Sequence, residues 1–279
     1  MNMSEEQMQW LVKVFQPERA VASLPGAASL TMHARAALLG LDPDYYSAEC
    51  ARLVAGARNA AQELLADPEV GAMVDHLPLR SGARVFALGD SRTSDPQSWA
   101  VILHEMLALR RPADNISVVA SAVSGDTTTH GLIRIGEVLA GDPDWVLFFI
   151  GLNDARTQGP QPAKTIVHHE ETARNFAELR ARVTKETRAR CLWITPVAAI
   201  ENKVSEHWAL ARFGVRFRNE DIARVAEAMR GFGDPVADLF QRFDVPSLGK
   251  MLMDDGLHFT ETGQQRIALE VLRDWCDVK

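Results

Sequence analysis

Short apolar runs alternate with helix-forming stretches over most of the chain after residue 84. This pattern is typical of parallel strands that are buried on both faces by helices. We predict strands at 85–88, 116–120, 146–150, 191–194 and 236–239. We predict helices near 97–110, 128–140, 165–188, 212–230 and 262–275. The alternation predicts an α/β fold, in three α/β/α layers, around a five-stranded parallel sheet.

The last predicted helix has a start signal and a clear apolar face. Thr262 and Gln265 have the spacing of a capping box, in which each side chain binds a free backbone N–H at the helix start. Ile267, Val271 and Trp275 recur at the spacing of one helix face, which we expect to pack on the sheet.

The first 80 residues contain helical spacings and no strand signal. Prolines at 17, 25, 43 and 68 divide this region into short predicted helices. We therefore predict a helical extension over residues 1–80, followed by one domain over residues 81–279. The extension could cover a sheet edge, form a lid or build an oligomer interface. We favour packing or a homo-oligomer interface, because no motif in this region resembles a site.

Composition excludes several classes of function. The net charge is −7 and the basic residues are scattered, which argues against nucleic-acid binding. Residues 1–15 lack the pattern of a signal peptide, and the apolar run 145–150 is far shorter than the roughly 20 residues of a membrane helix. Three cysteines without a CxxC spacing indicate free thiols: Cys50, Cys191 and Cys276. We predict a cytoplasmic protein that acts on a small molecule and binds neither membrane nor nucleic acid.

Polar, glycine-containing segments follow the first three predicted strands, and another precedes the last helix. They are Gly89-Asp90-Ser91, Ser124-Gly125-Asp126-Thr127, Gly151-Leu152-Asn153-Asp154 and Asp255-Gly256-Leu257-His258. Parallel strands end at one edge of a sheet, so we expect these segments to lie together. A serine hydrolase needs such a set of groups: a hydroxyl, an imidazole, a carboxylate and donors for an oxyanion. Each segment alone could be an ordinary turn or helix cap, so the hypothesis depends on all of them together.

In order and spacing these segments resemble the sequence blocks of the SGNH/GDSL hydrolases, with S, G, N and H at Ser91, Gly125, Asn153 and His258. The stretches 123–132 and 253–258 are closest in wording to the bacterial thioesterase/lysophospholipase branch of that family. The resemblance extends over about residues 84–275 and implies a flavodoxin-like SGNH hydrolase fold.

The resemblance also implies a role for each motif residue. Ser91 would be the nucleophile, His258 the general base and then acid, and Asp255 the group that orients the imidazole. The backbone N–H groups of Ser91 and Gly125 and the side-chain amide of Asn153 would form the oxyanion hole. These roles imply a serine esterase that hydrolyses a carboxylic ester or thioester through an acyl-enzyme, with no metal and no organic cofactor. An acyltransferase using the same intermediate and a non-catalytic binding module are the alternatives.

Two further charged residues stand beside these motifs. The family generally has an apolar or small residue after the nucleophile, whereas this chain has Arg92. A salt bridge from Arg92 to Asp95 or Asp126 is our preferred interpretation, and a contact to an anionic part of the substrate is the other. Asp154 would either cap a helix or face the substrate. Arg92 and Asp154 are therefore possible substrate-binding residues.

Overall fold

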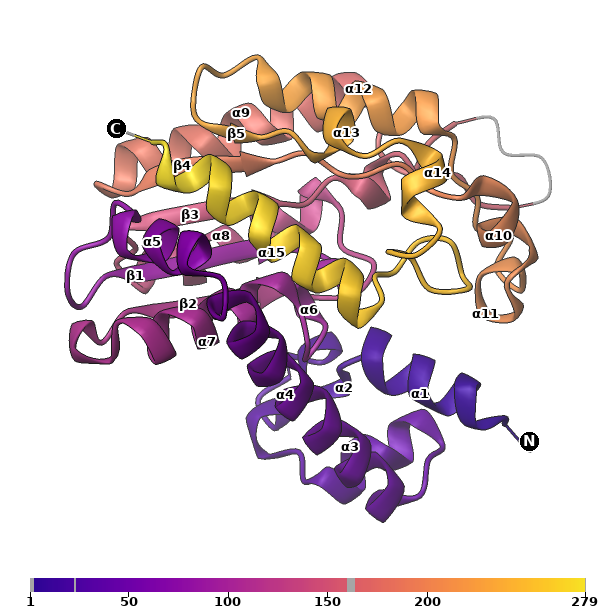
Figure 1. Ribbon diagram of the computed structural model, residues 1–279. Coiled ribbons are helices and arrows are strands. Elements are labelled where there is room, and N and C mark those ends of the chain that lie inside the picture. Colours follow the sequence, from indigo (N-terminus) through magenta and orange to yellow (C-terminus); the bar gives the residue numbers. More distant parts are fainter. Residues whose placement is uncertain (1–2, 23, 160–163, 279) are drawn as a thin grey trace.

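A five-stranded parallel sheet forms the centre of the computed structural model, which describes residues 3–22, 24–159 and 164–278 (Figure 1). Its strands are β1 (Arg84–Gly89), β2 (Ser117–Ala122), β3 (Trp145–Phe149), β4 (Arg190–Ile194) and β5 (Val236–Ala237). They lie in the order β2-β1-β3-β4-β5. The chain crosses over β1 after β2, so the strand order reverses between β1 and β3. Ligands of open α/β sheets bind outside the carboxyl ends of the strands at such a reversal.

Helices cover both faces of the sheet, which confirms the predicted three-layer α/β/α fold. One face packs against α5 (Pro68–His76), α7 (Trp99–Arg110) and α15 (Glu261–Cys276). The other packs against α8 (Thr128–Ala140), α9 (His169–Glu186) and α12 (Asn219–Arg230). Strand β3 contributes apolar side chains to the core on both faces of the sheet. Successive side chains of a strand point to opposite faces, and all five residues of β3 are apolar.

The other helices after residue 84 are short and lie between these elements in sequence. They are α6 (Ser91–Ser94), α10 (Glu201–Glu206), α11 (Trp208–Ala211), α13 (Leu239–Arg242), α14 (Val245–Leu248) and the 3₁₀ turns η2 (Pro112–Asp114) and η3 (Leu152–Asp154).

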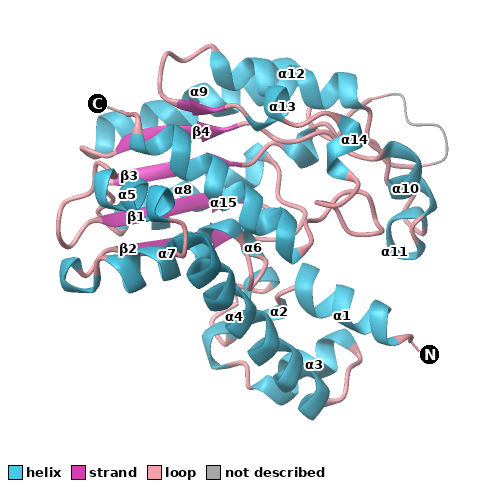
Figure 2. Cartoon of the chain, viewed as in Figure 1, coloured by secondary structure: helices cyan, strands magenta, loops and turns pink. Residues whose placement is uncertain are grey.

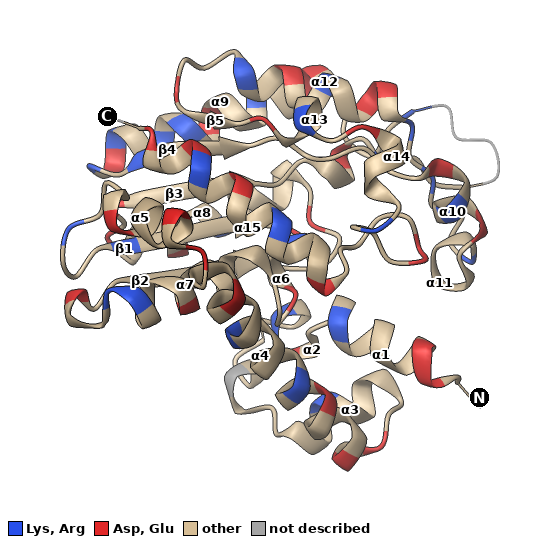
Figure 3. Cartoon of the chain, viewed as in Figure 1, with Lys and Arg blue, Asp and Glu red and all other residues tan. Residues whose placement is uncertain are grey.

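In the described part of the chain, no helix combines the length and the apolar composition that crossing a membrane requires. Lys and Arg alternate with Asp and Glu along the helices (Figure 3).

The structure corrects several predicted boundaries. The helices predicted to begin at 165 and 212 begin at His169 and Asn219. Helix α15 is capped by Thr260, whose hydroxyl oxygen accepts from the Gly263 N–H at 3.1 Å, so the predicted capping box at Thr262 is wrong. Strand β5 ends at Ala237 rather than 239, because Asp238 turns the chain and caps α13. The predicted apolar face of α15 is confirmed, since its three members are fully buried: Ile267, Val271 and Trp275.

The described part of the amino-terminal region is helical, as predicted (Figure 2). It comprises α1 (Glu5–Val14), α2 (Pro17–Ala20), η1 (Ala27–Ser29), α3 (Met32–Leu39), α4 (Pro43–Leu65) and α5. Pro17, Pro43 and Pro68 each occupy the first helical turn, where a missing N–H costs nothing. Helix α4 packs on α7 and α15, while α1 runs past α6 at the carboxyl edge of the sheet (Figure 1).

Candidate active site

Ser91 lies directly beyond β1, as the first residue of α6. The turn before it requires glycine, since a Cβ on Gly89 would lie 2.3 Å from Thr93 Oγ1 and 3.1 Å from the Phe149 carbonyl oxygen. Asp90 caps α6, because its Oδ1 accepts from the Arg92 N–H at 3.0 Å. The sequence Gly-Asp-Ser therefore folds into a sharp turn that places Ser91 at the carboxyl edge of the sheet.

Ser91, His258 and Asp255 form a continuous hydrogen-bonded chain. The Ser91 Oγ lies 2.9 Å from His258 Nε2, and His258 Nδ1 lies 2.6 Å from Asp255 Oδ2. All three side chains are buried, with Ser91 and His258 each 7% exposed. A hydroxyl, an imidazole and a carboxylate in this order can activate the hydroxyl as a nucleophile.

Asp255 also organises the turn that carries His258. Its Oδ1 accepts from the N–H groups of Leu257 at 2.8 Å and His258 at 2.9 Å. Gly256 has a φ of +68° and a Cβ there would lie 2.7 Å from the Ile200 carbonyl oxygen, so the turn requires glycine. Burial raises the pKa of Asp255, but the charge and hydrogen bonds of His258 outweigh burial and hold this pKa well below its usual range. Asp255 is therefore ionised at neutral pH.

Trp10 of α1 joins this chain of side chains. Its indole Nε1 donates to Asp255 Oδ2 at 2.6 Å, the same oxygen that binds His258. The indole ring also packs edge-on to the His258 ring, with centroids 5.9 Å apart. The amino-terminal region packs on the domain, as we favoured, and it also places one side chain at the site, which we did not expect. No local pattern around Trp10 could have indicated a partner so far along the chain.

Buried polar contacts hold α1 against the site. Lys13 Nζ lies 2.8 Å from Asp95 Oδ2 and 3.2 Å from Gln97 Oε1, just after α6. The Ser124 hydroxyl donates to the Val14 carbonyl oxygen. Helix α1 is thus tied to the segment after Ser91 and to the segment that contains Gly125, which fixes the position of Trp10.

Ser91, Gly125 and Asn153 line one cavity, and each carries an N–H donor. Within the described residues, the backbone N–H groups of Ser91 and Gly125 have no acceptor. Gly125 has a φ of +86°, a conformation that suits glycine. The Asn153 Nδ2 donates to the Asp126 carbonyl oxygen at 3.0 Å and lies 3.4 Å from Asp90 Oδ2, so its amide is held in place. Such donors can stabilise a negatively charged oxygen.

The cavity beside Ser91 has a volume of about 360 Å³. Apart from the motif residues, its lining is largely apolar and comes from α1, the segment after Asn153 and the segment around α11. These residues are Trp10, Val14, Phe15, Ser124, Arg156, Leu210, Val215, Phe217 and Leu257. The described residues include no group of three or more His, Cys, Asp or Glu side chains placed to hold a metal ion.

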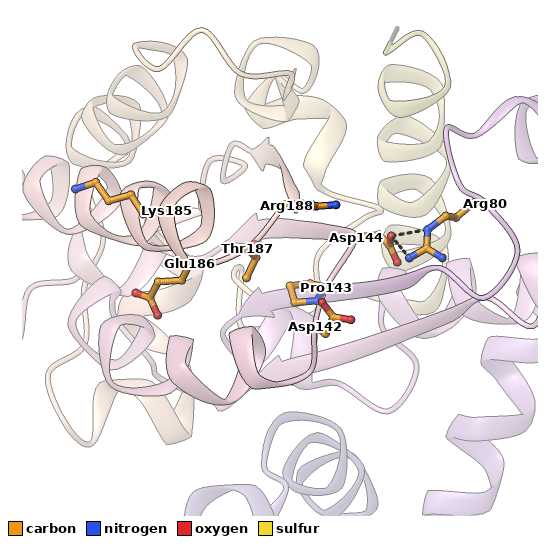
Figure 4. Close-up of a pocket in the computed structure, with 8 residues that line it drawn as sticks. All are labelled: Arg80, Asp142, Pro143, Asp144, Lys185, Glu186, Thr187 and Arg188. Carbon is orange, nitrogen blue, oxygen red and sulfur yellow. Dashed lines mark hydrogen bonds and ion pairs between the residues drawn. The ribbon is translucent and has the colours of Figure 1, made fainter.

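A larger hollow of about 800 Å³ lies at the opposite edge of the sheet, where β1, β3 and β4 begin (Figure 4). Its lining consists of Arg80, Asp142, Pro143, Asp144, Lys185, Glu186, Thr187 and Arg188. Asp144 is bound there by Arg80 Nε at 2.9 Å, as the close-up shows. None of the motif residues reaches this hollow, so we place the site in the smaller cavity.

Arg92 lies beneath the site rather than in it. The side chain is only 1% exposed, its Nε donates to the Leu257 carbonyl oxygen at 3.2 Å, and its guanidinium lies 4.9 Å from the centre of the Phe259 ring. Burial lowers the pKa of Arg92 to about 10. The expected salt bridge is wrong, since Asp95 pairs with Lys13 and Asp126 with Arg134. Arg92 is also absent from the cavity lining, which argues against the predicted substrate contact.

Asp154 has a structural position as well. It is fully buried, and it accepts from the N–H of Thr128 at 2.9 Å, from the hydroxyl of Thr128, and from the hydroxyl of Thr172 at 3.0 Å. Burial raises the pKa of Asp154 to about 6. The residue thus links the first turns of α8 and α9, which agrees with the helix-capping interpretation and not with substrate contact.

Comparison with known proteins gives consistent results. The sequence profile of the GDSL-like lipase/acylhydrolase family matches residues 87–266. Thioesterase 1/protease 1/lysophospholipase L1 of Escherichia coli K12 is 27% identical over 197 residues, which cover 68% of this chain and 80% of that protein. A lipase/acylhydrolase from Enterococcus faecalis has a similar structure, with a TM-score of 0.54, 24% identity and coverage of 68% of this chain and 94% of the other. An acetylxylan esterase from Geobacillus stearothermophilus gives a TM-score of 0.55 at 20% identity, over 72% and 97% of the two chains.

Proposed function

The chain belongs to the GDSL-like lipase/acylhydrolase family and is a serine hydrolase of the SGNH type, and from this premise we propose that Ser91 carries its esterase activity. The proposed reaction is hydrolysis of a carboxylic ester or thioester through an acyl-Ser91 intermediate. The observation that supports it most directly is the chain of hydrogen bonds from Ser91 through His258 to Asp255. The name of the Escherichia coli relative, which includes both thioesterase and lysophospholipase, agrees with these two ester classes.

In the first step His258 takes the proton of Ser91 while the Oγ attacks the carbonyl carbon. The His258 Nε2 faces the Oγ at 2.9 Å, a suitable distance for this transfer. Asp255 is ionised and therefore stabilises the imidazolium that forms. His258 then gives the proton to the departing alcohol or thiol, and the acyl group remains on Ser91. In the second step water attacks the acyl-enzyme, and His258 carries the proton from water back to Ser91.

The carbonyl oxygen becomes negatively charged in both steps. We propose that it is bound by the free N–H groups of Ser91 and Gly125 and by the Asn153 amide, which line the same cavity. The α6 turn and the Gly125 turn set the positions of the two backbone N–H groups, so these donors need little reorganisation during the reaction. The Asn153 amide would share with the oxyanion a hydrogen that it now donates to Asp126 or Asp90. A single donor of this kind typically contributes about 10²–10³-fold to kcat.

A fluorophosphonate probe tests the assignment of the nucleophile. We expect the folded protein to form one covalent adduct, located on Ser91 by mass spectrometry of a digest, because among the described serines only Ser91 has an imidazole at hydrogen-bonding distance of its hydroxyl. Protein unfolded in urea is the control, and it should remain unlabelled because its Ser91 and His258 are no longer in contact. An adduct on another residue, or no adduct, would contradict the proposal.

We also propose that Trp10 positions Asp255. The indole N–H and His258 bind the same carboxylate oxygen, so Trp10 restricts the orientation of the carboxylate that in turn orients the imidazole. Trp10 precedes the part of the chain that matches the family profile, which makes this contact a contribution of the amino-terminal region.

Trp10→Phe should lower kcat for a short p-nitrophenyl ester by about tenfold while KM changes within about twofold. The phenyl ring keeps most of the packing against His258, but it cannot donate to Asp255. The control is Trp208→Phe, since Trp208 packs on Trp10 at 5.5 Å and makes no hydrogen bond to Asp255. Equal kcat values for the two variants would remove the positioning role of Trp10.

A further inference from the structure

Arg156 lines the cavity that contains Ser91, and its side chain has no partner among the residues that the structure describes. Its side chain forms neither a hydrogen bond nor an ion pair with any described residue, and its Nε is buried without an acceptor. Burial lowers the pKa of Arg156, and no neighbouring carboxylate offsets that effect. A guanidinium that has lost part of its water without gaining an acceptor binds an anion more readily than a solvated one does.

The backbone at Arg156 is held by the same turn that holds Asn153. The Arg156 N–H donates to the Asn153 carbonyl oxygen at 3.3 Å, and the Arg156 carbonyl oxygen accepts from the Ile166 N–H at 2.7 Å. The next residue, Thr157, forms an antiparallel bridge with Arg216. The guanidinium is therefore carried by a fixed segment that begins at the proposed oxyanion hole.

Among the described residues, none that lines the cavity is a counter-ion for Arg156. The lining residues include no Asp or Glu, and the two that flank Arg216 in the bridge, Val215 and Phe217, are apolar. Carboxylates close to the site are already engaged, Asp126 with Arg134 and Asp255 with His258. A negative group next to Arg156 must therefore come from the substrate.

We propose that Arg156 binds a carboxylate carried by the ester substrate, so that the enzyme prefers esters of this anionic class. This inference rests on the proposed esterase function of the same cavity. Arginine binds a carboxylate through two parallel N–H donors, which combines charge with a defined geometry. Arg156 is the single permanently charged residue among the cavity-lining side chains, and one positive charge balances a carboxylate better than a doubly charged phosphate.

Arg92 does not compete for this role. Its guanidinium is also without a complete set of acceptors, but it is 1% exposed and packs on the Phe259 ring below the cavity. The anion-binding role that the sequence suggested for Arg92 is thus better placed at Arg156, which faces the cavity.

Matched pairs of substrates test the proposal on the full chain. The mono-4-nitrophenyl ester of adipic acid and 4-nitrophenyl hexanoate differ by a carboxylate on the acyl side. The esters 4-acetoxybenzoate and 4-acetoxybenzamide differ by a carboxylate on the leaving group. For at least one pair we expect kcat/KM to favour the charged ester by about tenfold or more, as suits a charge-assisted hydrogen bond. The pair that shows the preference identifies the end of the substrate that Arg156 contacts.

Arg156→Gln should reduce this charged-to-neutral ratio to near one, and Arg156→Lys should keep part of it as a point charge without the planar fork. Arg216→Gln is the matched control, because Arg216 is a partly buried arginine across the bridge that lines a neighbouring hollow instead. It should keep the wild-type ratio. A wild-type ratio near one in both pairs, or a preference that survives in Arg156→Gln, would overturn the proposal. Ser91-dependent hydrolysis of the neutral esters reports separately on the esterase function.

Discussion

Ser91→Ala is expected to lower kcat for a short p-nitrophenyl ester by about 10⁶-fold, to the level left by binding and the oxyanion donors alone. The Ser91 Oγ is the atom that would carry the acyl group, and it is the only hydroxyl in hydrogen-bonding contact with His258 among the described residues. Without it, His258 has no nucleophile to activate. Stopped assays with the purified variant, compared with spontaneous hydrolysis, measure this loss.

Ser94→Ala provides the matched control. Ser94 is in the same short helix as Ser91, it is also buried, and its hydroxyl has no hydrogen-bond partner among the described residues. Its loss removes a buried hydroxyl without touching the proposed nucleophile, so we expect activity within about twofold of wild type. Substantial activity in Ser91→Ala would show that the acyl group is carried elsewhere and would overturn the proposed function.

The features that could be predicted from sequence are those set by local patterns. Buried strands appear as short apolar runs, and the groups that follow β1 and β3 then meet at one edge because parallel strands share a direction. Ser91 and Asn153 belong to this class. The pairing of His258 with Asp255 could also be predicted from a local pattern, since Asp255 and Gly256 belong to the turn that carries His258. The structure places all these groups in or beside one cavity, as expected.

Contacts between distant segments could not be predicted in the same way. Trp10 reaches Asp255 from a helix that is held in place by the ion pair of Lys13 with Asp95 and by the hydrogen bond from Ser124 to the Val14 carbonyl. Each of these contacts is ordinary in type, and none leaves a periodic pattern in the sequence. The position of α1 is therefore a consequence of tertiary packing alone.

Arg92 shows how charge in a sequence can mislead. An arginine beside acidic residues suggests an ion pair, but the turn before α6 directs this side chain under the loop of His258. There a backbone carbonyl and the Phe259 ring replace a carboxylate as its neighbours. The acidic residues meanwhile bind cations from other segments, which only the folded arrangement reveals. Arg156 was not singled out from the sequence, because the conformation of the loop that begins with it cannot be derived from local patterns.

Asp255→Asn should lower kcat by about 10⁴-fold while the protein remains folded, an effect of the wrong imidazole tautomer rather than of lost packing. Every contact of the Asp255 carboxylate is with a donor: two backbone N–H groups on Oδ1, and His258 and Trp10 on Oδ2. An asparagine offers one oxygen and one NH₂ group. The backbone donors cannot rotate away, so the oxygen should face them and the NH₂ group should face His258 and Trp10.

In this orientation His258 must accept from the amide at Nδ1 and therefore keeps its proton on Nε2, where it faces Ser91. It then cannot take the proton of Ser91. Asp254→Asn is the control, because the side chain of Asp254 is 98% exposed and belongs to the same turn. In Asp255→Asn the indole N–H of Trp10 would face the new NH₂ group, and two donors repel each other. The double variant Asp255→Asn/Trp10→Phe should therefore have a higher melting temperature than Asp255→Asn, while its kcat stays low. An Asp255→Asn enzyme that keeps more than about a tenth of wild-type kcat would show that the carboxylate does not set the tautomer.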